Sequence, residues 1–199
     1  MELLRDVTVL AVRQQVEWVE VLADFETQNR YVVCDGEGRE LLYAAEHSGV
    51  FSRMIFQSTR PFTIDVLDAD GKLVLRLRRP WRFYFHQVNV LDADGRPIGT
   101  VVRRFSVLRR IYSVLDDNGA EMLRLFGPVL HPWTFRILAD GQELGKIRKR
   151  WSGLGKEAFT DADNFGMDLP ADMDPRTKGL LLGAVFLIDY VHFEKSTRN

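Results

Sequence analysis

Short apolar runs separated by Asp- and Gly-rich turns make up most of this chain. Within the runs, apolar residues occupy every second position, as in Phe62, Ile64 and Val66, which is the period of a β-strand with one buried face. Asp-Gly and Asn-Gly between such runs are the strongest local signal for a β-hairpin, because Gly, Asn and Asp tolerate positive φ. The turns predicted in this way are Asp35-Gly36, Asp68-Ala69-Asp70-Gly71, Asp92-Ala93-Asp94-Gly95, Asp116-Asp117-Asn118-Gly119 and Asp140-Gly141.

The hairpins repeat at a nearly constant spacing. Gly71, Gly95, Gly119 and Gly141 lie 24, 24 and 22 residues apart, which fits two strands and two connections per unit. Such a meander predicts a mainly β protein of about a dozen antiparallel strands, and closure into a barrel would leave no open sheet edge. Because a barrel of about eight strands is already filled by its side chains, a wider one has room for a helix.

A different pattern occupies the C-terminal part of the chain. Asp174 is suited to cap a helix and Pro175 to its first position, where no amide donor is needed. From Gly179 to Ile188 no side chain is polar, and a helix that is apolar on every side needs apolar surroundings. A bilayer-spanning helix takes about 20 apolar residues, and Asp189 interrupts the run. We therefore predict a helix over 175–194, buried at the centre of a closed β-barrel rather than in lipid.

Composition limits the domain count and the compartment. With 199 residues, 46% of them hydrophobic, the chain can form one domain with a sizeable core, so residues 1–199 are assigned to a single domain. A net charge of −1 gives no overall attraction to polyanions. The single cysteine, Cys34, and charges at Glu2, Arg5 and Asp6 in place of a signal-peptide pattern predict a cytoplasmic protein. The arginine-rich, lysine-poor composition indicates a bacterial source.

Motifs for covalent catalysis do not occur in the sequence. It contains no phosphate-cradling Gly-rich loop, no nucleophile elbow and no HExxH. The four histidines, which are scattered without metal-ligand spacing, are His47, His86, His131 and His192. We therefore expect a protein that is not an enzyme.

Several segments carry a family resemblance. They are Phe25-Glu26-Thr27-Gln28-Asn29-Arg30-Tyr31, Tyr43-Ala44-Ala45-Glu46, Arg60-Pro61-Phe62, Gly145-Lys146-Ile147 with Trp151, and above all EAFTDADNFGMDLPADMD from Glu157 and GAVFLIDYVHFE from Gly183. Together they resemble the phospholipid scramblase family of the tubby-like and LURP-one-related superfamily, from about residue 16 to Glu194. The resemblance implies a β-barrel around a hydrophobic C-terminal helix. It also implies a role in calcium-dependent, energy-independent movement of phospholipids between membrane leaflets.

Two features depart from the eukaryotic members of that family. Those members carry a Pro-rich N-terminal region, whereas this chain is short and starts almost directly at the predicted barrel. They also have cysteine clusters, thought to be acylated, where this chain reads Val50-Phe51-Ser52-Arg53-Met54-Ile55-Phe56 and Trp81-Arg82-Phe83-Tyr84-Phe85-His86. The replacements are bulky, apolar and flanked by arginine, as in segments that seek a membrane interface; the alternative is that they are strands that feed the core.

The resemblance places the family's proposed calcium site in the acidic segment 161–172. This segment has the length of an EF-hand loop, with Asp at positions one, three and twelve and Gly at position six. Apolar residues at positions five, seven and nine alternate as in a strand, and the favoured alternative is an Asp-capped turn that leads into a barrel strand. Any calcium affinity is expected to be weak. The candidate metal residues are Asp161, Asp163, Phe165, Met167, Leu169 and Asp172.

Basic clusters follow the second strand of successive hairpins. If the hairpins stand in register, these clusters gather at the barrel rim opposite the Asp-rich turns, beside Trp81, Phe83 and Phe85. Such a rim attracts anionic phospholipid head groups at the inner face of a membrane, or nucleic acid. The alternatives are solvated strand ends, or a soluble binding module without scrambling activity. The predicted rim residues are Arg78, Arg79, Arg103, Arg104, Lys149 and Arg150.

Overall fold

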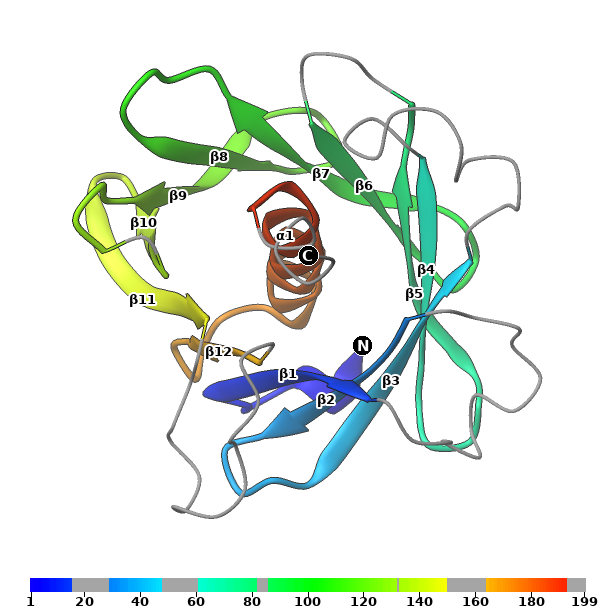
Figure 1. Ribbon diagram of the computed structural model, residues 1–199. Coiled ribbons are helices and arrows are strands. Elements are labelled where there is room, and N and C mark those ends of the chain that lie inside the picture. Colours follow the sequence, from blue (N-terminus) through cyan, green and yellow to red (C-terminus); the bar gives the residue numbers. More distant parts are fainter. Residues whose placement is uncertain (16–28, 48–60, 82–85, 132, 150–163, 193–199) are drawn as a thin grey trace, which may run out of the picture.

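The described residues of the computed structural model form one closed antiparallel β-barrel around a single α-helix (Figure 1). The description covers residues 1–15, 29–47, 61–81, 86–131, 133–149 and 164–192. Within these ranges the strands are β1 (Val9–Gln15), β2 (Arg30–Asp35), β3 (Glu40–His47), β4 (Phe62–Leu67), β5 (Leu73–Arg79), β6 (Gln87–Asp92), β7 (Pro97–Arg104), β8 (Arg110–Leu115), β9 (Glu121–Gly127), β10 (Thr134–Ala139), β11 (Gln142–Lys149) and β12 (Phe165–Asp168). A short 3-10 helix, η1 (Glu2–Leu4), precedes them.

Each strand pairs with its neighbours in sequence, and β1 pairs with β12 to close the barrel. The predicted alternation is confirmed: on β10, Phe135 and Ile137 are buried in the core, whereas Arg136 between them faces solvent. On β12, Phe165 and Met167 point inward and belong to the same core. The predicted mainly β architecture of about a dozen strands is therefore confirmed.

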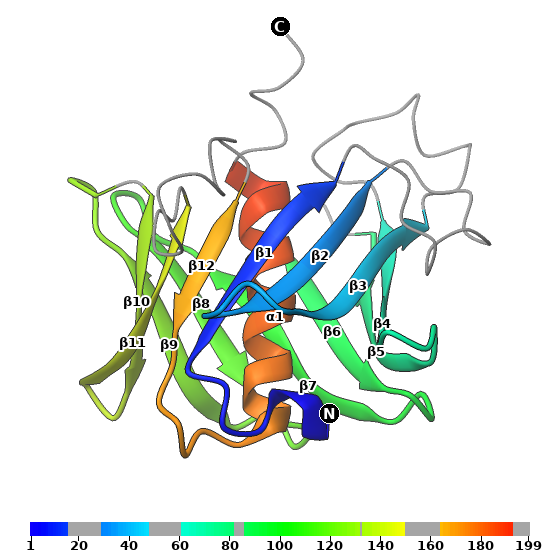
Figure 2. The same cartoon turned by 90° about the horizontal axis from the view of Figure 1, so that it is seen from below.

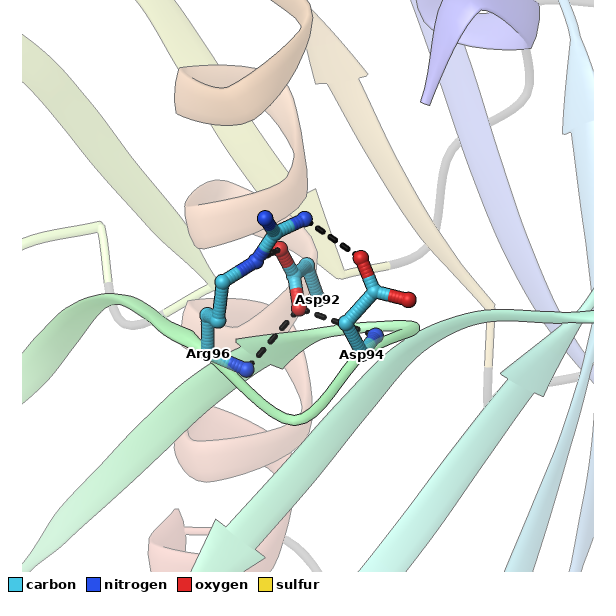
Figure 3. A network of polar contacts seen from close by, with 3 residues as sticks. All are labelled: Asp92, Asp94 and Arg96. Carbon is cyan, nitrogen blue, oxygen red and sulfur yellow. Dashed lines mark hydrogen bonds and ion pairs between the residues drawn. The ribbon is translucent and has the colours of Figure 1, made fainter.

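The Asp-rich hairpins share one turn geometry, which the β6–β7 turn illustrates (Figure 3). The Asp92 carboxylate accepts hydrogen bonds from the backbone amides of Asp94 (3.0 Å) and Arg96 (2.9 Å), and Gly95 adopts a φ of 79°. The Arg96 side chain pairs with both carboxylates. Burial opposes ionisation of Asp92, but the hydrogen bonds from Arg96 outweigh it and lower the pKa of this carboxyl. These acids therefore fix the turn.

The helix α1 (Pro175–His192) runs along the barrel axis (Figures 1 and 2). Asp174 caps it: its Oδ2 accepts hydrogen bonds from the amides of Arg176 (3.2 Å) and Thr177 (3.3 Å). Thirteen of its eighteen residues are buried, which is possible only because the barrel encloses the helix on all sides. The predicted central helix is confirmed to His192, and residues 193–194 of the prediction lie outside the described residues. Among the helices described, none combines the length and apolar character needed to cross a membrane.

Candidate functional site

The two ends of the barrel differ in chemistry. At one end lie η1, the N-terminus of α1 and the Asp-rich hairpins, whose carboxylates are held by their own turns (Figure 2). At the opposite end β5, β7 and β11 finish in basic residues, β8 starts with Arg110, and α1 ends at His192. We call this second end the basic end. The segments that follow β1, β3, β5 and β11 in the sequence lie mostly outside the described residues.

The predicted rim cations are divided between the two faces of the barrel wall. Arg79 is 1% exposed and Lys149 8% exposed, so neither belongs to an exposed rim as the sequence pattern suggested. The physical reason is strand alternation: neighbours in a basic pair point to opposite faces, and of the predicted rim cations that the structure describes only Arg78 and Arg104 face outward. Arg104 pairs there with Ser113 and Glu121. Arg150 lies outside the described residues.

Two of the inward cations hold the helix to the wall. The Arg79 guanidinium lies over the Tyr190 ring (4.3 Å from Cζ to the centroid), and its Nη2 is 2.7 Å from Nδ1 of His86. Lys149 Nζ lies 3.3 Å from Oδ1 of Asp189 on α1. These contacts fix the C-terminal part of α1 against β5 and β11. The role of Arg79 and Lys149 is structural, because both side chains are buried and contact α1.

A second inward group surrounds the last turn of α1. The hydroxyl of Tyr112 lies 2.8 Å from Nε2 of His192, within hydrogen-bonding distance. Burial, together with the nearby charges of Arg103 and Arg110, lowers the pKa of His192 to about 3. Burial lowers the pKa of Arg110, and repulsion from Arg103 acts in the same direction. The ring of Phe135 covers Arg110 at 4.9 Å.

Arg103 is a further inward cation at this end. It continues the inward row of β7 after Val101, it is half-buried, and in the described part of the chain no carboxylate lies within ion-pair distance of it. The carbonyls at the C-terminus of α1 carry a partial negative charge that offsets only part of this cationic charge. Arg103 and Arg110 therefore place two cationic side chains beside the last turn of α1, an arrangement suited to an anion.

Exposed apolar side chains gather at the same end. Of the ten large hydrophobic side chains exposed in the described residues, seven lie there. They come from the β7–β8 loop, the β9–β10 loop and the end of β5: Phe105, Val107, Leu108, Val129, Leu130, Trp133 and Trp81. The sequence reasoning identified only Trp81 among them; Phe83 and Phe85, which it also proposed, lie outside the described residues. The missed signal was apolar residues in connections between hairpins, where polar residues are usual.

The acidic segment does not form an EF-hand loop where it is described. Residues 165–168 are strand β12, paired with β1 on one edge and β11 on the other, so the backbone is not free to wrap an ion. The side chains of Phe165, Met167 and Leu169 are buried in the core, and Asp172 is exposed. Among the described residues no group of three or more acidic, His or Cys side chains is placed to hold a metal. Asp161 and Asp163 lie outside them, so calcium binding stays a prediction.

Comparison with known proteins gives a consistent picture. The family model described as Scramblase matches residues 1–195. Phospholipid scramblase 1 of Rattus norvegicus is 32% identical over 210 residues, which cover 98% of this chain and 63% of the rat protein. Phospholipid scramblase 2 of Bos taurus is 34% identical over 208 residues, which cover 98% of this chain and 71% of the bovine one. The bacterial source inferred from composition finds no support in these comparisons.

A solved structure shares the fold. The X-ray structure of an Arabidopsis thaliana protein superposes with a TM-score of 0.50 and 15% sequence identity, and the match covers 91% of each chain. At this identity the likeness concerns the overall architecture alone.

Proposed function

Because the chain belongs to the scramblase family, whose model covers nearly all of it, we propose that it engages phospholipid membranes and promotes energy-independent exchange of phospholipids between leaflets. The relatives that match are phospholipid scramblases, and this chain spans about two thirds of their length. The proposed activity is translocation or binding of lipid, without covalent chemistry. Its place is the cytoplasmic side of a membrane, as a peripheral protein.

The observation that carries the proposal is the group of arginines at the basic end. Arg103 and Arg110 face inward beside the last turn of α1, and Arg78 and Arg104 face outward on the same end. A basic residue near an anionic membrane contributes about 1 kcal/mol to attraction. The acidic residues gather in the turns at the opposite end. This charge distribution favours one orientation of the protein on an anionic membrane, with the basic end toward the phosphate head groups.

The helix is proposed to stay inside the barrel while the protein acts. Withdrawing it would expose thirteen buried residues and break the contacts of Lys149 with Asp189 and of Arg79 with Tyr190. At about 25 cal/mol per Å² of apolar surface, the loss would exceed the total stability of a typical domain, about 5–15 kcal/mol. A peripheral mode of action needs no such step.

Calcium dependence, which the family resemblance implies, has no described site to support it. The strand geometry of residues 165–168 does not fit an EF-hand loop. We therefore derive no step of lipid exchange through calcium.

The proposal is tested by reconstitution. The protein is added to vesicles of equal parts phosphatidylcholine and phosphatidylserine that carry a fluorescent lipid in both leaflets, and a membrane-impermeant reductant reports leaflet exchange, with and without calcium. We expect exchange above protein-free vesicles, and a several-fold loss of vesicle binding in Arg103→Gln. Lys72→Gln, which makes the same charge change at the hairpin end, is the matched control and should bind normally. Bound protein without lipid exchange would refute the scrambling activity, and absence of binding would refute membrane engagement itself.

A further inference from the structure

We propose that the β7–β8 loop (residues 105–109) and the described part of the β9–β10 loop (residues 128–131 and 133) form a two-loop anchor that inserts its apolar side chains into the interface of a lipid bilayer. The inference rests on the proposed membrane function and adds to it which part of the chain enters the lipid.

Exposure is the first observation. Phe105 and Val107 are each 84% exposed and Leu108 is 76% exposed, while Leu130 in the second loop is 87% exposed. Isolated apolar residues on a surface are ordinary, but a contiguous group of this size marks a contact surface. Trp133, at 48%, adds the residue type most enriched at membrane–water interfaces.

The two loops lie side by side because of the strand register. Arg110 of β8 pairs with Gly127 of β9, and one loop precedes Arg110 while the other follows Gly127. The Arg110 guanidinium also donates a hydrogen bond to the carbonyl of His131 (3.5 Å). The apolar side chains therefore form one surface rather than two separate projections.

Internal hydrogen bonds give both loops a defined shape. Ser106 Oγ accepts from the amide of Arg109 at 3.2 Å, and the carbonyl of His131 accepts from the amide of Thr134 at 3.1 Å. Preorganised loops lose little conformational entropy on docking, which favours them as insertion elements.

Charge identifies the partner. The stretches RRFSVLRR (103–110) and GPVLHPWTFR (127–136) contain five arginines and no Asp or Glu. Two of the five, Arg104 and Arg136, pair with glutamates outside these stretches. A second copy of the same surface would bring like charges together, whereas an anionic bilayer offers both an apolar interior for the loop tips and phosphates for the flanking arginines. The occupant that fits is a negatively charged lipid surface.

Site-specific labelling tests the anchor. Cys34 is the only native cysteine and is fully buried, so an environment-sensitive fluorophore can be directed to Leu108→Cys or Leu130→Cys, and to Asn118→Cys at the hairpin end as control. Unlabelled wild-type protein verifies that Cys34 does not react. On vesicles of equal parts phosphatidylcholine and phosphatidylserine, labels at 108 and 130 should shift to the blue and be quenched by lipids brominated in the acyl chain, whereas the label at 118 should do neither.

The outcomes separate this inference from the proposed function. If the protein sediments with the vesicles while the labels at 108 and 130 stay in water, the anchor is refuted and membrane binding survives. If a blue shift appears without vesicles and grows with protein concentration, the surface is a contact between copies and the anchor is also refuted. A paired test uses Leu108→Ser with Leu130→Ser, expected to weaken vesicle binding about tenfold or more, against Met122→Ser on the outer wall, expected to leave it unchanged.

Discussion

Lowering the pH from 7 to 5 should destabilise the barrel through His192. The ring lies against Tyr112 and Phe135, with centroid separations of 6.2 Å in both cases. Burial, followed by repulsion from Arg103, Arg110 and His86, lowers its pKa from 6.5 to about 3. In the folded protein the imidazole therefore stays neutral down to about pH 3, whereas in the unfolded chain it takes up a proton near pH 6.5. Between these values the unfolded state binds more protons, so stability falls as the pH falls.

The size of the effect follows from the two pKa values. At pH 5 the unfolded imidazole is almost fully protonated and the folded one is neutral, which corresponds to a loss of at most about 2 kcal/mol relative to pH 7. Part of the ring reaches solvent, where its charge is screened, so a loss of about 1 kcal/mol is expected. For a domain of this class that is a readily measured fraction of total stability, which is about 5–15 kcal/mol.

Urea denaturation at pH 7 and pH 5 measures this loss. His192→Gln keeps a polar group near the Tyr112 hydroxyl but does not titrate. The carboxylates of the protein contribute equally in wild type and variant, so the difference between their losses of stability from pH 7 to pH 5 measures the contribution of the imidazole. His131→Gln, which removes an exposed histidine from the same end, is the matched control and should behave as wild type. Equal loss of stability in wild type and His192→Gln would refute the reasoning.

Three further predictions concern packing, the helix contacts and calcium. Gly99→Ala should lower the free energy of unfolding by about 3 kcal/mol or more, because a Cβ would lie 2.2 Å from the carbonyl oxygen of Leu115. Gly95→Ala, where φ is positive but the space around the Cβ is open, should lower it by about 1 kcal/mol. Equal losses for the two variants in urea denaturation would contradict this. Lys149→Met should cost about 2–3 kcal/mol by removing the buried ion pair with Asp189, and adding Asp189→Asn should restore most of it; additive losses in a double-mutant cycle would argue against the pair. Asp161→Ala together with Asp163→Ala should weaken folding more than any calcium response, and calorimetric detection of micromolar calcium binding that these changes remove would show otherwise.

The sequence predicted the architecture because period-two alternation, Asp-Gly turns and an all-apolar helix are local signals. The alternation along β5 also predicts that the two members of a basic pair face opposite sides of the barrel wall, since Arg79 continues the inward row of Leu75 and Leu77. The prediction of an exposed rim placed both members of each basic pair on the same side, and it was wrong for Arg79 for that reason. The first hairpin shows a similar limit: the dipeptide Asp35-Gly36 marked the turn, but the residue with positive φ is Gly38.

Other features could not be predicted from local patterns. The Lys149–Asp189 ion pair and the Tyr112–His192 contact join residues far apart in sequence. They depend on how the barrel closes and on the rotation of α1 within it, and no periodicity encodes either. The apolar residues of the two loops were visible in the sequence, but their grouping on one surface was not, because the loops become neighbours only through the pairing of β8 with β9.

Closure of the barrel between β1 and β12 has a consequence for biosynthesis. Val9 pairs with Asp168, so the first strand has no partner on one edge until almost the whole chain has been made. At about 5–20 residues per second, the nascent sheet would present an open edge and an unfilled apolar interior for about ten seconds or more. Unpaired edges of this kind associate with other chains. A chain that terminates early within α1 should therefore be a substrate for chaperones and proteases rather than a smaller soluble protein, and the speed at which the last segments are supplied sets the yield of the folded barrel.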